Sequence, residues 1–464
     1  MKKNFKLLAG NPDFWKNQIV LKSGQLKTDT ILQKIVFFVV FSYSLFTLQT
    51  QAQQTHIFTT GNSDLPSNNV TSIAIDAQGN KWFGTNTGVV AKFDNVNWTV
   101  YDSSNSGLPG DYIISTIVID KQDNKWIGLN YSYTQGDGAG LVKFDNTNWT
   151  VYNQSNSGLP NNKVSRIDID SFGNKWIGTW GGGVAKFDDS IWVVYNSANS
   201  DLPDDYISEI EIDDLGNKWI AAQGGIAKCD DTSWTVYDYN SILPAHEQGF
   251  ISSIAIDDKG NKWFGVSDES WDPEAAGGVA VFDNQNWSFY NSTNSGLPYG
   301  VYSIANDGRG SIWFGTAHTW NYSDAAVAKF DGSKWTVYNY ANSGMPNVLV
   351  SSIAIDAQGN KWFGTPNIGV VVFNENGIKT GLSDRLSDSS DDFTVYPNPA
   401  KDLISIEGMS TRIVQIFNSS GQIVKNLEAQ GMPANVDISN LPEGIYTVRI
   451  RTKDKVVSKK FIKK

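Results

Sequence analysis

The sequence is poor in the residues that build disulfides and metal centres. Its 464 residues include one cysteine, Cys229, and three histidines, His56, His246 and His318. A single cysteine excludes a disulfide framework and a cysteine-ligated zinc cluster, and three scattered histidines argue against a multi-histidine metal centre. Charged residues make up only 18%, and the net charge is -11. Nucleic acid is therefore not an expected partner, because binding its phosphates requires a basic surface.

Long apolar runs are scarce as well. Residues 35–48 read IVFFVVFSYSLFTL, which is shorter than the roughly 20 residues that span a bilayer. Lys34 precedes this run and Thr50-Gln51-Ala52 follows it. This layout predicts that residues 1–52 are a secretory signal peptide with an atypically long N-terminal region, cleaved after Ala52. A short membrane anchor is the alternative, and no transmembrane helix is expected in the mature chain.

Aromatic residues, in contrast, are plentiful. They make up 12% of the chain and include 17 Trp, which argues against long disorder. Charge is distributed unevenly along the chain, since residues 1–52 carry a net +5 and residues 392–464 a net +4, and the stretch between them carries -20. The acidic middle and the basic C-terminal segment are therefore expected to be different domains.

A repeat of 43–50 residues dominates the middle of the chain. It is centred on a Trp that recurs seven times, at positions 82, 126, 176, 219, 263, 313 and 362. Each complete unit contains four short β-rich runs, which in the first unit are SIAID, KWFGT, VVAKF and WTVY. Four strands in about 45 residues match one propeller blade. The repeats predict an all-β fold, with a seven-bladed β-propeller over residues 55–378.

The ends of the repeat array indicate how the ring closes. The last unit lacks a fourth strand after Val370 to Phe373, and an isolated β-rich run, residues 56–60, precedes the first unit. Because an open ring leaves two unpaired sheet edges, this N-terminal strand is predicted to complete the last blade.

The repeated polar and aromatic residues have structural explanations. An Asp lies six positions before each repeat Trp, at a turn where its carboxylate can accept backbone N–H hydrogen bonds. The Trp residues are expected to pack between blades, because their rings bury a large area. Cys229 replaces a Phe of the other units and is expected to be a buried apolar residue.

These units resemble the two component regulator propeller repeat, in which a KWFGT-type strand is followed by a Gly and a hydrophobic-Phe-Asp strand. Asp123, Ala221 and Ser311 are local departures from that pattern. The resemblance covers about residues 55–378. It implies the propeller fold and ligand binding, since such propellers often form the glycan-sensing part of signalling proteins.

Three units are longer than the others, and the extra residues lie between their second and third strands. The insertions are Leu129 to Gly140, Val266 to Gly278 and Thr316 to Ala326, and loops at this position emerge on one face of a propeller. Binding residues are often found on loops held by a rigid scaffold. The candidate ligand-binding residues are Tyr131, Tyr133, Asp268, Trp271, Asp272, His318, Trp320 and Tyr322.

Aromatic side chains beside carboxylates suit a sugar, a protein or calcium, which prefers oxygen ligands. Tolerated surface insertions are the alternative, because long loops cost little. The sequence has no serine-nucleophile elbow, HExxH motif or phosphate loop, and no catalytic residue or cofactor is assigned. The first hypothesis is a non-catalytic module that binds a glycan or protein. The others are a secreted propeller lyase or glycan hydrolase, and a structural or adhesive surface protein.

The C-terminal part has a different composition. Residues 379–391 form a Ser/Asp-rich linker, and the short strands of residues 392–464 predict a small β-sandwich. Its motifs, at Tyr396, Pro397, Asn398, Pro399, Gly421, Gly444 and Tyr446, resemble the C-terminal sorting domain of the type IX (Por) secretion system. The resemblance implies that the type IX translocon is a partner. It also implies an extracellular or outer-membrane-attached location in a Gram-negative bacterium of the Bacteroidetes. A terminal sandwich that binds glycans or is purely structural is the alternative.

Overall fold

The computed structural model describes residues 54–132, 136–244, 249–268, 277–317, 326–378, 394–407, 413–418, 423–428, 434–451 and 456–464. In this part of the chain nearly all regular structure is β-strand, which confirms the predicted all-β class. No helix within these ranges is long and apolar enough to cross a membrane.

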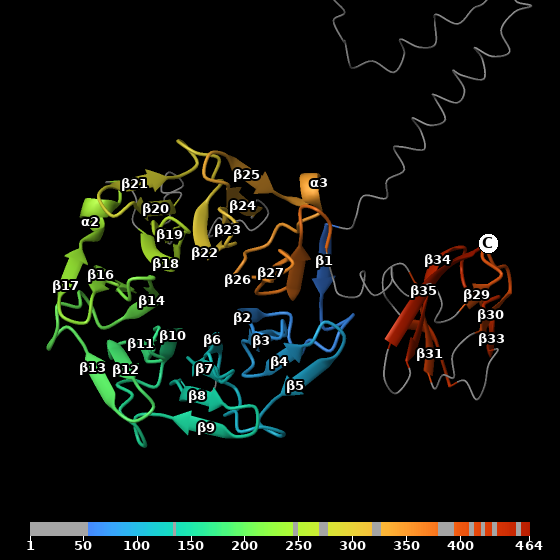
Figure 1. Ribbon diagram of the computed structural model, residues 1–464, viewed down its shortest axis with the longest axis horizontal. Coiled ribbons are helices and arrows are strands. Elements are labelled where there is room, and N and C mark those ends of the chain that lie inside the picture. Colours follow the sequence, from blue (N-terminus) through green and yellow to red (C-terminus); the bar gives the residue numbers. More distant parts are fainter. Residues whose placement is uncertain are drawn as a thin grey trace, which may run out of the picture. The chain divides into compact units, whose positions relative to one another are not determined.

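Between Thr55 and Phe373, the described strands form seven four-stranded antiparallel sheets arranged around a common centre, as in a propeller (Figure 1). Blade one is β2 (Val70–Ile75), β3 (Lys81–Thr85), β4 (Val90–Phe93) and β5 (Trp98–Tyr101), and blade two is β6 (Ile114–Ile119), β7 (Lys125–Leu129), β8 (Gly140–Phe144) and β9 (Trp149–Tyr152). Blade three is β10 (Val164–Ile169), β11 (Lys175–Thr179), β12 (Val184–Phe187) and β13 (Trp192–Tyr195), and blade four is β14 (Ile207–Ile212), β15 (Lys218–Ala222), β16 (Gly225–Cys229) and β17 (Trp234–Tyr237). Blade five is β18 (Gly249–Ile256), β19 (Lys262–Asp268), β20 (Gly278–Phe282) and β21 (Trp287–Tyr290), and blade six is β22 (Gly300–Asn306), β23 (Ile312–Ala317), β24 (Ala326–Phe330) and β25 (Trp335–Tyr338). Blade seven joins β1 (Thr55–Phe58) to β26 (Ser352–Ile355), β27 (Lys361–Gly364) and β28 (Val370–Phe373).

The N-terminal strand supplies the outer edge of blade seven. β1 pairs antiparallel with β28, with Thr55 opposite Phe373 and Phe58 opposite Val370. Phe58 also stacks on Trp362 of the same blade, with the ring centroids 6.1 Å apart. The two ends of the propeller sequence are therefore held in one sheet, and the last blade has four strands like the others.

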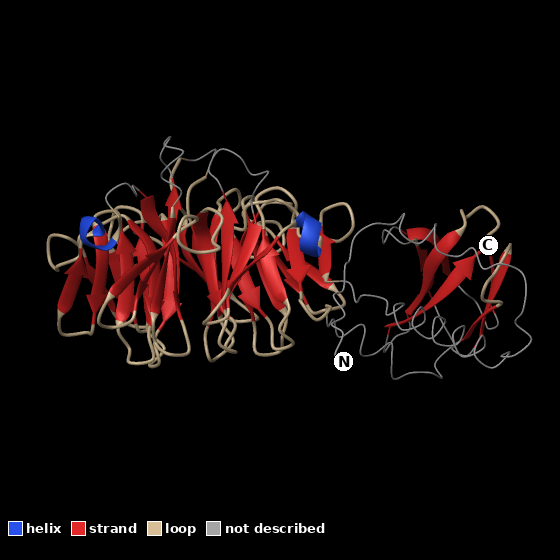
Figure 2. Cartoon of the chain, turned by 90° about the horizontal axis from the view of Figure 1, so that it is seen from above, coloured by secondary structure: helices blue, strands red, loops and turns tan. Residues whose placement is uncertain are grey.

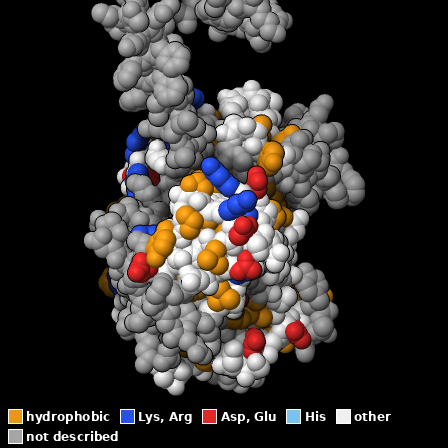
Figure 3. Space-filling model, turned by 90° about the vertical axis from the view of Figure 1, so that its right-hand side faces the viewer, with side chains coloured by type: hydrophobic (Ala, Val, Ile, Leu, Met, Phe, Trp, Pro, Cys, Tyr) orange, Lys and Arg blue, Asp and Glu red, His pale blue; other side chains and the backbone are white. Residues whose placement is uncertain are grey.

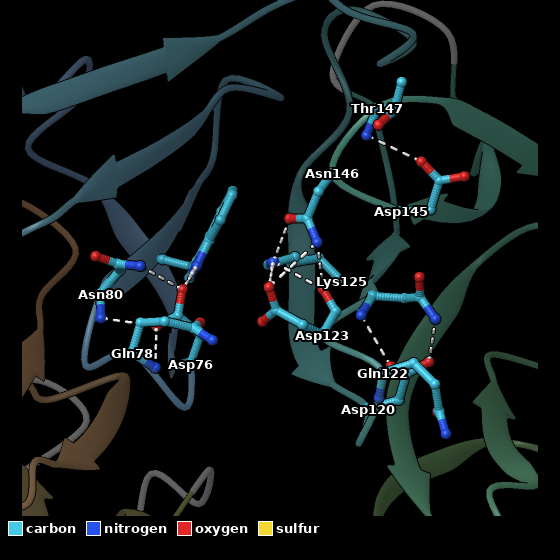
Figure 4. A network of polar contacts seen from close by, with 12 residues as sticks. Asp76, Gln78, Asn80, Asp120, Gln122, Asp123, Lys125, Asp145, Asn146 and Thr147 are labelled. Carbon is cyan, nitrogen blue, oxygen red and sulfur yellow. Dashed lines mark hydrogen bonds and ion pairs between the residues drawn. The ribbon is translucent and has the colours of Figure 1, made fainter.

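The repeated Asp organises the turn between the first and second strands of each blade. In blade one, Asp76 accepts hydrogen bonds from the backbone N–H groups of Gln78 and Asn80, at 3.1 and 2.8 Å, and from Trp82 Nε1 at 3.0 Å (Figure 4). Gly79 completes the turn with φ +81°, a backbone conformation that glycine adopts without strain. The predicted turn role of the Asp is confirmed, and the bond to the indole was not anticipated.

The same Asp–Trp bond is present in every blade, at donor–acceptor distances from 2.9 to 3.4 Å. The pairs are Asp76–Trp82, Asp120–Trp126, Asp170–Trp176, Asp213–Trp219, Asp257–Trp263, Asp307–Trp313 and Asp356–Trp362. Each indole N–H, which needs an acceptor when it is buried, is thus satisfied by the turn of its own blade. The ring itself is left free to pack against the next blade.

A buried lysine of the next blade lies over each ring but one. Lys125 Nζ, for example, lies 4.7 Å from the Trp82 ring centroid and 2.6 Å from Asn146 Oδ1 (Figure 4). The equivalent lysine–ring pairs are Lys81–Trp362, Lys175–Trp126, Lys218–Trp176, Lys262–Trp219 and Lys361–Trp313, at 4.2–5.1 Å. Desolvated cation–π contacts of this kind stabilise by about 2 kcal/mol, so they join successive blades.

Blade six lacks both the buried lysine and its acceptor. Ile312 replaces the lysine and packs in the cluster that contains Trp263. Gly332 occupies the turn position where the other blades carry an acceptor such as Asn95 or Asn146. An ammonium buried without acceptors is costly, so the loss of both residues in the same blade is physically consistent.

The described strands from Thr394 onward form a two-sheet sandwich, here called the C-terminal unit. One sheet contains β29 (Thr394–Tyr396), β30 (Leu403–Glu407) and β33 (Ala434–Asp437). The other contains β31 (Ile413–Phe417), β32 (Ile423–Glu428), β34 (Gly444–Arg451) and β35 (Val456–Lys463). Ile404, Val414, Val448 and Phe461 are among the fully buried residues of its core. Figure 3 shows a face of the molecule on which apolar side chains lie among charged ones.

Candidate ligand-binding site

The propeller strands run between two faces that differ in their loops (Figure 2). The turns from first to second and from third to fourth strand lie on one face, here called the turn face. The opposite face, here called the insertion face, carries the loops from second to third strand and the connections from each fourth strand to the next blade. Two of those connections contain the short helices α2 (Tyr239–Ile242) and α3 (Tyr340–Ser343).

A ring of hydroxyl residues lies on the first strands, near the insertion face. Five blades contribute Ser at this position, one contributes Thr and blade six contributes Tyr: Thr71, Ser115, Ser165, Ser208, Ser252, Tyr302 and Ser351. Several of these hydroxyls donate to a backbone carbonyl of the next blade. Ser115 donates to Val164 O at 2.7 Å, and Ser351 donates to Val70 O at 2.7 Å. These bonds join the inner strands of neighbouring blades.

Ser165 of blade three departs from this pattern. Its side-chain oxygen is buried and has no hydrogen-bond partner among the described residues, and the residue is only 5% exposed. A buried hydroxyl without a partner costs about 1–3 kcal/mol. Such an exception requires an explanation, and the position of Ser165 in the wall of a cavity provides one.

Two adjoining cavities open at this end of the ring. The first, of about 330 Å³, is lined by residues of blades two to seven that include Ser165, Arg166, Trp180, Phe250 and Tyr302. The second, of about 320 Å³, is lined by Asn130, Tyr131, Lys163 and Trp180. Asn130 and Trp180 line both cavities, so the two form one continuous site at the mouth of the central channel.

Two exposed aromatic side chains, Tyr131 and Trp180, line this site, and a third, Tyr206, contacts Trp180. Tyr131 is 41% exposed, Trp180 45% and Tyr206 42%. The Trp180 and Tyr206 rings meet edge to face, with centroids 5.5 Å apart and planes at 82°. Lys163 Nζ lies 6.0 Å from the Tyr131 ring centroid. Aromatic rings half open to water form a surface on which a ligand can stack.

Backbone hydrogen bonds hold the loops that carry Tyr131 and Trp180. The Trp180 N–H donates to Lys163 O at 2.9 Å, and Gly181 and Gly183 both donate to Asp205 O at 3.0 Å. In the blade-two insertion, Ile113 N donates to Tyr131 O at 3.1 Å. A Cβ on Gly138 would lie 2.1 Å from Asn162 O, so glycine is required where this loop meets the next connection.

Charged residues gather on the inner strands of blades three and four. Arg166 Nε and Glu209 Oε2 form an ion pair at 2.9 Å, while Asp168 accepts from Ile212 N of the next blade at 2.8 Å. Burial raises the pKa of Asp168 to about 7, and burial also raises the pKa values of Glu209 and Glu211. At the positions equivalent to Arg166 and Asp168, blades one, five, six and seven carry Ser and Ala, respectively.

The structure places only part of the predicted site. Tyr131 lines the second cavity, and Asp268 ends β19 without a described side chain. Tyr133, Trp271, Asp272, His318, Trp320 and Tyr322 lie outside the described residues, and their role stays a prediction. The described part contains no group of three or more His, Cys, Asp or Glu side chains suited to a metal ion, so the calcium prediction now concerns the loops outside it.

Sequence reasoning missed Trp180 and Tyr206, because both belong to connections of ordinary length. The signal was present in the repeat itself. At the position of Trp180, other blades carry small or amide side chains, among them Asn86, Gln223 and Ala317. Packing does not require a bulky aromatic residue where the other repeats have smaller side chains. Its presence in one repeat therefore indicates a local function.

The sorting-motif residues are joined by contacts within the C-terminal unit. Asn398 Oδ1 accepts from Ile462 N at 2.9 Å, and Ala400 exchanges backbone bonds with Ile462 and Lys464 at 2.8 Å. The Tyr446 hydroxyl donates to Pro442 O at 2.7 Å. The first motif and the end of the chain therefore stabilise one structure, while Gly421 lies outside the described residues.

Comparison with known proteins agrees with both parts. Residues 64–87 match the family model of the two component regulator propeller, and residues 394–464 match the secretion system C-terminal sorting domain. No curated protein matches the chain significantly.

Solved structures share the fold at low identity. The extracellular domain of the hybrid two component system BT3049 from B. thetaiotaomicron is 17% identical, with a TM-score of 0.55 over 89% of this chain and 57% of that one. PorZ, a surface component of the type-IX secretion system of Porphyromonas gingivalis, is 18% identical, with a TM-score of 0.52 over 86% and 60%. Streptogramin B lyase is 15% identical, with a TM-score of 0.52 over 70% and 99%. The chain thus spans less than two thirds of the first two proteins.

The fold and the family matches define a β-propeller protein followed by a sorting domain. More specifically, the chain combines a two component regulator propeller with a type IX C-terminal sorting domain, as the sequence motifs predicted. The sorting domain implies secretion to the cell surface or the extracellular space.

Proposed function

We propose that the protein is a non-catalytic ligand-binding propeller, exported after removal of residues 1–52, whose insertion face binds a glycan. The observation that carries this proposal is the pair of adjoining cavities at the channel mouth, lined by the exposed rings of Tyr131 and Trp180, with Tyr206 packed against Trp180. Volumes of about 330 and 320 Å³ fall at the lower end of the range for small-molecule sites. Cavities of that size suit one or two sugar units better than they suit a folded protein, whose binding surface is flat.

The chemistry of the lining also favours a saccharide. Aromatic rings can stack on the C–H faces of a sugar, while Asn130, Ser165 and Ser208 offer hydrogen-bonding groups for its hydroxyls. The second cavity lies beside the blade-two insertion, which is one of the three loops that extend this face. No arrangement of a nucleophile with a base occurs among the residues that line the two cavities.

Binding of the full chain to a glycan array, followed by calorimetry with the best saccharide, tests the proposal. We expect Trp180→Ala to weaken binding about tenfold, because stacking on one aromatic ring contributes up to about 1.5 kcal/mol beyond the area it buries. Phe172→Ala is the matched control, since Phe172 is an 88% exposed aromatic on the turn face. Equal losses in the two variants, or turnover of the saccharide, would contradict the proposal.

The insertion loops of blades five and six are tested separately. If the site extends to blades five and six, as the sequence predicts, Trp271→Ala or Trp320→Ala will also weaken binding of the same saccharide. Binding that depends on Trp180 alone would restrict the site to blades two to four. A repeat of the measurement with chelator shows whether calcium takes part.

A further inference from the structure

The charge of the cavity walls is opposite to that of the chain. The net charge is -11, and the stretch between residues 53 and 391 carries -20. Yet the charged residues that line the two cavities are Arg166 in the first and Lys163 in the second, both cationic. A concave site focuses the field of the charges that line it, so two cations in the walls favour an anionic ligand.

Arg166 retains hydrogen-bonding capacity for such a ligand. Its Nε donates to Glu209, and its Nη1 donates to Ser115 O and Ser165 O at 3.3 and 3.0 Å. A guanidinium has five N–H donors, so within the described residues the two on Nη2 remain available. The Arg166 side chain is 30% exposed, whereas that of Glu209 is 12% exposed, so the guanidinium of this ion pair is the more open to a ligand.

Ser165 supplies a second, independent observation. It adjoins Arg166, lines the same cavity and carries the buried hydroxyl without a partner. The equivalent hydroxyl of Ser115 donates to the next blade instead. A hydroxyl excluded from water and from protein acceptors lowers its free energy by donating to a ligand oxygen, most strongly to a charged one.

We propose that the channel-mouth site is selective for acidic saccharides, whose carboxylate or sulfate is bound by Lys163 and Arg166 and hydrogen-bonded by Ser165 Oγ. This selectivity rests on the proposed glycan-binding function and adds the chemical class of the sugar. The aromatic rings beside the two cations provide the stacking surface, and the cations provide the discrimination between acidic and neutral sugars.

The decisive comparison uses two probes that share one sugar chain and differ in whether its carboxyl groups are charged. Binding of the full chain to trigalacturonic acid is measured by calorimetry against its methyl ester, in which the carboxylates are neutral. A sulfated disaccharide in a further arm distinguishes sulfate from carboxylate as the bound group, and a poly-glutamate peptide tests an acidic ligand of another kind. We expect the acid to bind at least tenfold more tightly than the ester, with the preference lost as salt is raised.

Two variants test the assigned residues without disturbing the Arg166–Glu209 ion pair. Lys163→Glu is expected to weaken binding of the acid about tenfold or more while leaving the ester unaffected, since it reverses a charge at the partly exposed cavity wall. Ser165→Ala is expected to weaken it about fivefold and to raise thermal stability, because it removes a buried hydroxyl that has no protein partner. Ser115→Ala is the matched control, which lowers stability but not affinity.

The outcomes separate this inference from the proposed function. Equal affinity for acid and ester would overturn the charge selectivity and leave glycan binding intact. Preferential binding of poly-glutamate would overturn the saccharide as ligand. A folded chain that binds no saccharide in any arm would overturn both proposals.

Discussion

Replacing Asp170 by Ala tests the turn that organises each blade. The Asp170 carboxylate accepts from Phe172 N at 3.0 Å, Asn174 N at 2.9 Å, Asn174 Nδ2 at 2.7 Å and Trp176 Nε1 at 3.2 Å. Trp176 is fully buried, so its indole N–H would lose its acceptor away from water. With about 1 kcal/mol for each of the other three bonds and about 1–3 kcal/mol for the buried indole donor, the expected loss is about 4–6 kcal/mol.

Unfolding followed by Trp fluorescence measures this loss in the propeller, because residues 392–464 contain no Trp. From the unfolding entropy of a unit this large, the midpoint temperature is expected to fall by about 6–9 °C. Asp145→Ala is the control, since Asp145 lies in an exposed turn and accepts from Thr147 and Asn148 but from no indole (Figure 4). Equal shifts for the two variants would refute the reasoning. So would a calcium-dependent midpoint in the wild type that Asp170→Ala abolishes.

Three further outcomes follow from the buried polar groups. Lys175→Met should cost about 1–2 kcal/mol in urea unfolding, because it removes the cation over Trp126, while its partner Asp189 is 58% exposed and contributes little. No measurable change would count against the cation–π contacts. The pKa of Asp168, raised to about 7, makes its contribution to stability greatest below pH 4, and this contribution is lost as pH rises through 7. Asp168→Asn should flatten that decline in thermal midpoints, and an unchanged slope would contradict the assignment. Burial raises the pKa of the Cys229 thiol, so a thiol reagent at pH 8 should label it only after unfolding, and rapid labelling of the native protein would show that it is accessible.

The propeller could be predicted because each blade repeats one physical pattern. The second strand KWFGT is buried along its whole length, whereas WTVY is only half-buried, and this difference between inner and outer strands is visible as a change in composition. The strand beginning at Thr55 could be paired with blade seven because the array lacked one strand there. Such arguments depend on the repeat period, which can be read from a single sequence.

The buried lysines could not be predicted in the same way. A Lys such as Lys125 normally indicates a solvent-exposed position, and its burial depends on a ring from the preceding blade and an acceptor from a turn 21 residues later. Each of these partners is reasonable alone, but the contact is set by the distance between blades. In the sequence, only the apolar Ile312 at the lysine position of blade six indicates that this position lies in an interface.

The candidate site was predicted from loop length, and this criterion found Tyr131 but not Trp180. Loop length detects added chain, whereas Trp180 is a substitution within a loop of standard length. The hydroxyl of Ser165 was also hidden, because its neighbours at the same repeat position have the same side chain and differ only in what it contacts. Whether a hydroxyl at this repeat position finds an acceptor depends on how adjacent blades are placed relative to each other.

The pairing of β1 with β28 has a consequence for the order in which the molecule forms. Each interior blade consists of residues close in sequence, but Thr55 must find Phe373, at a separation that makes this the most entropically demanding contact of the ring. The first propeller strand to be synthesised can therefore pair only after one of the last strands has been made. Six blades can assemble from local hairpins as they emerge, and the ring becomes a closed object only when almost the entire propeller sequence is present.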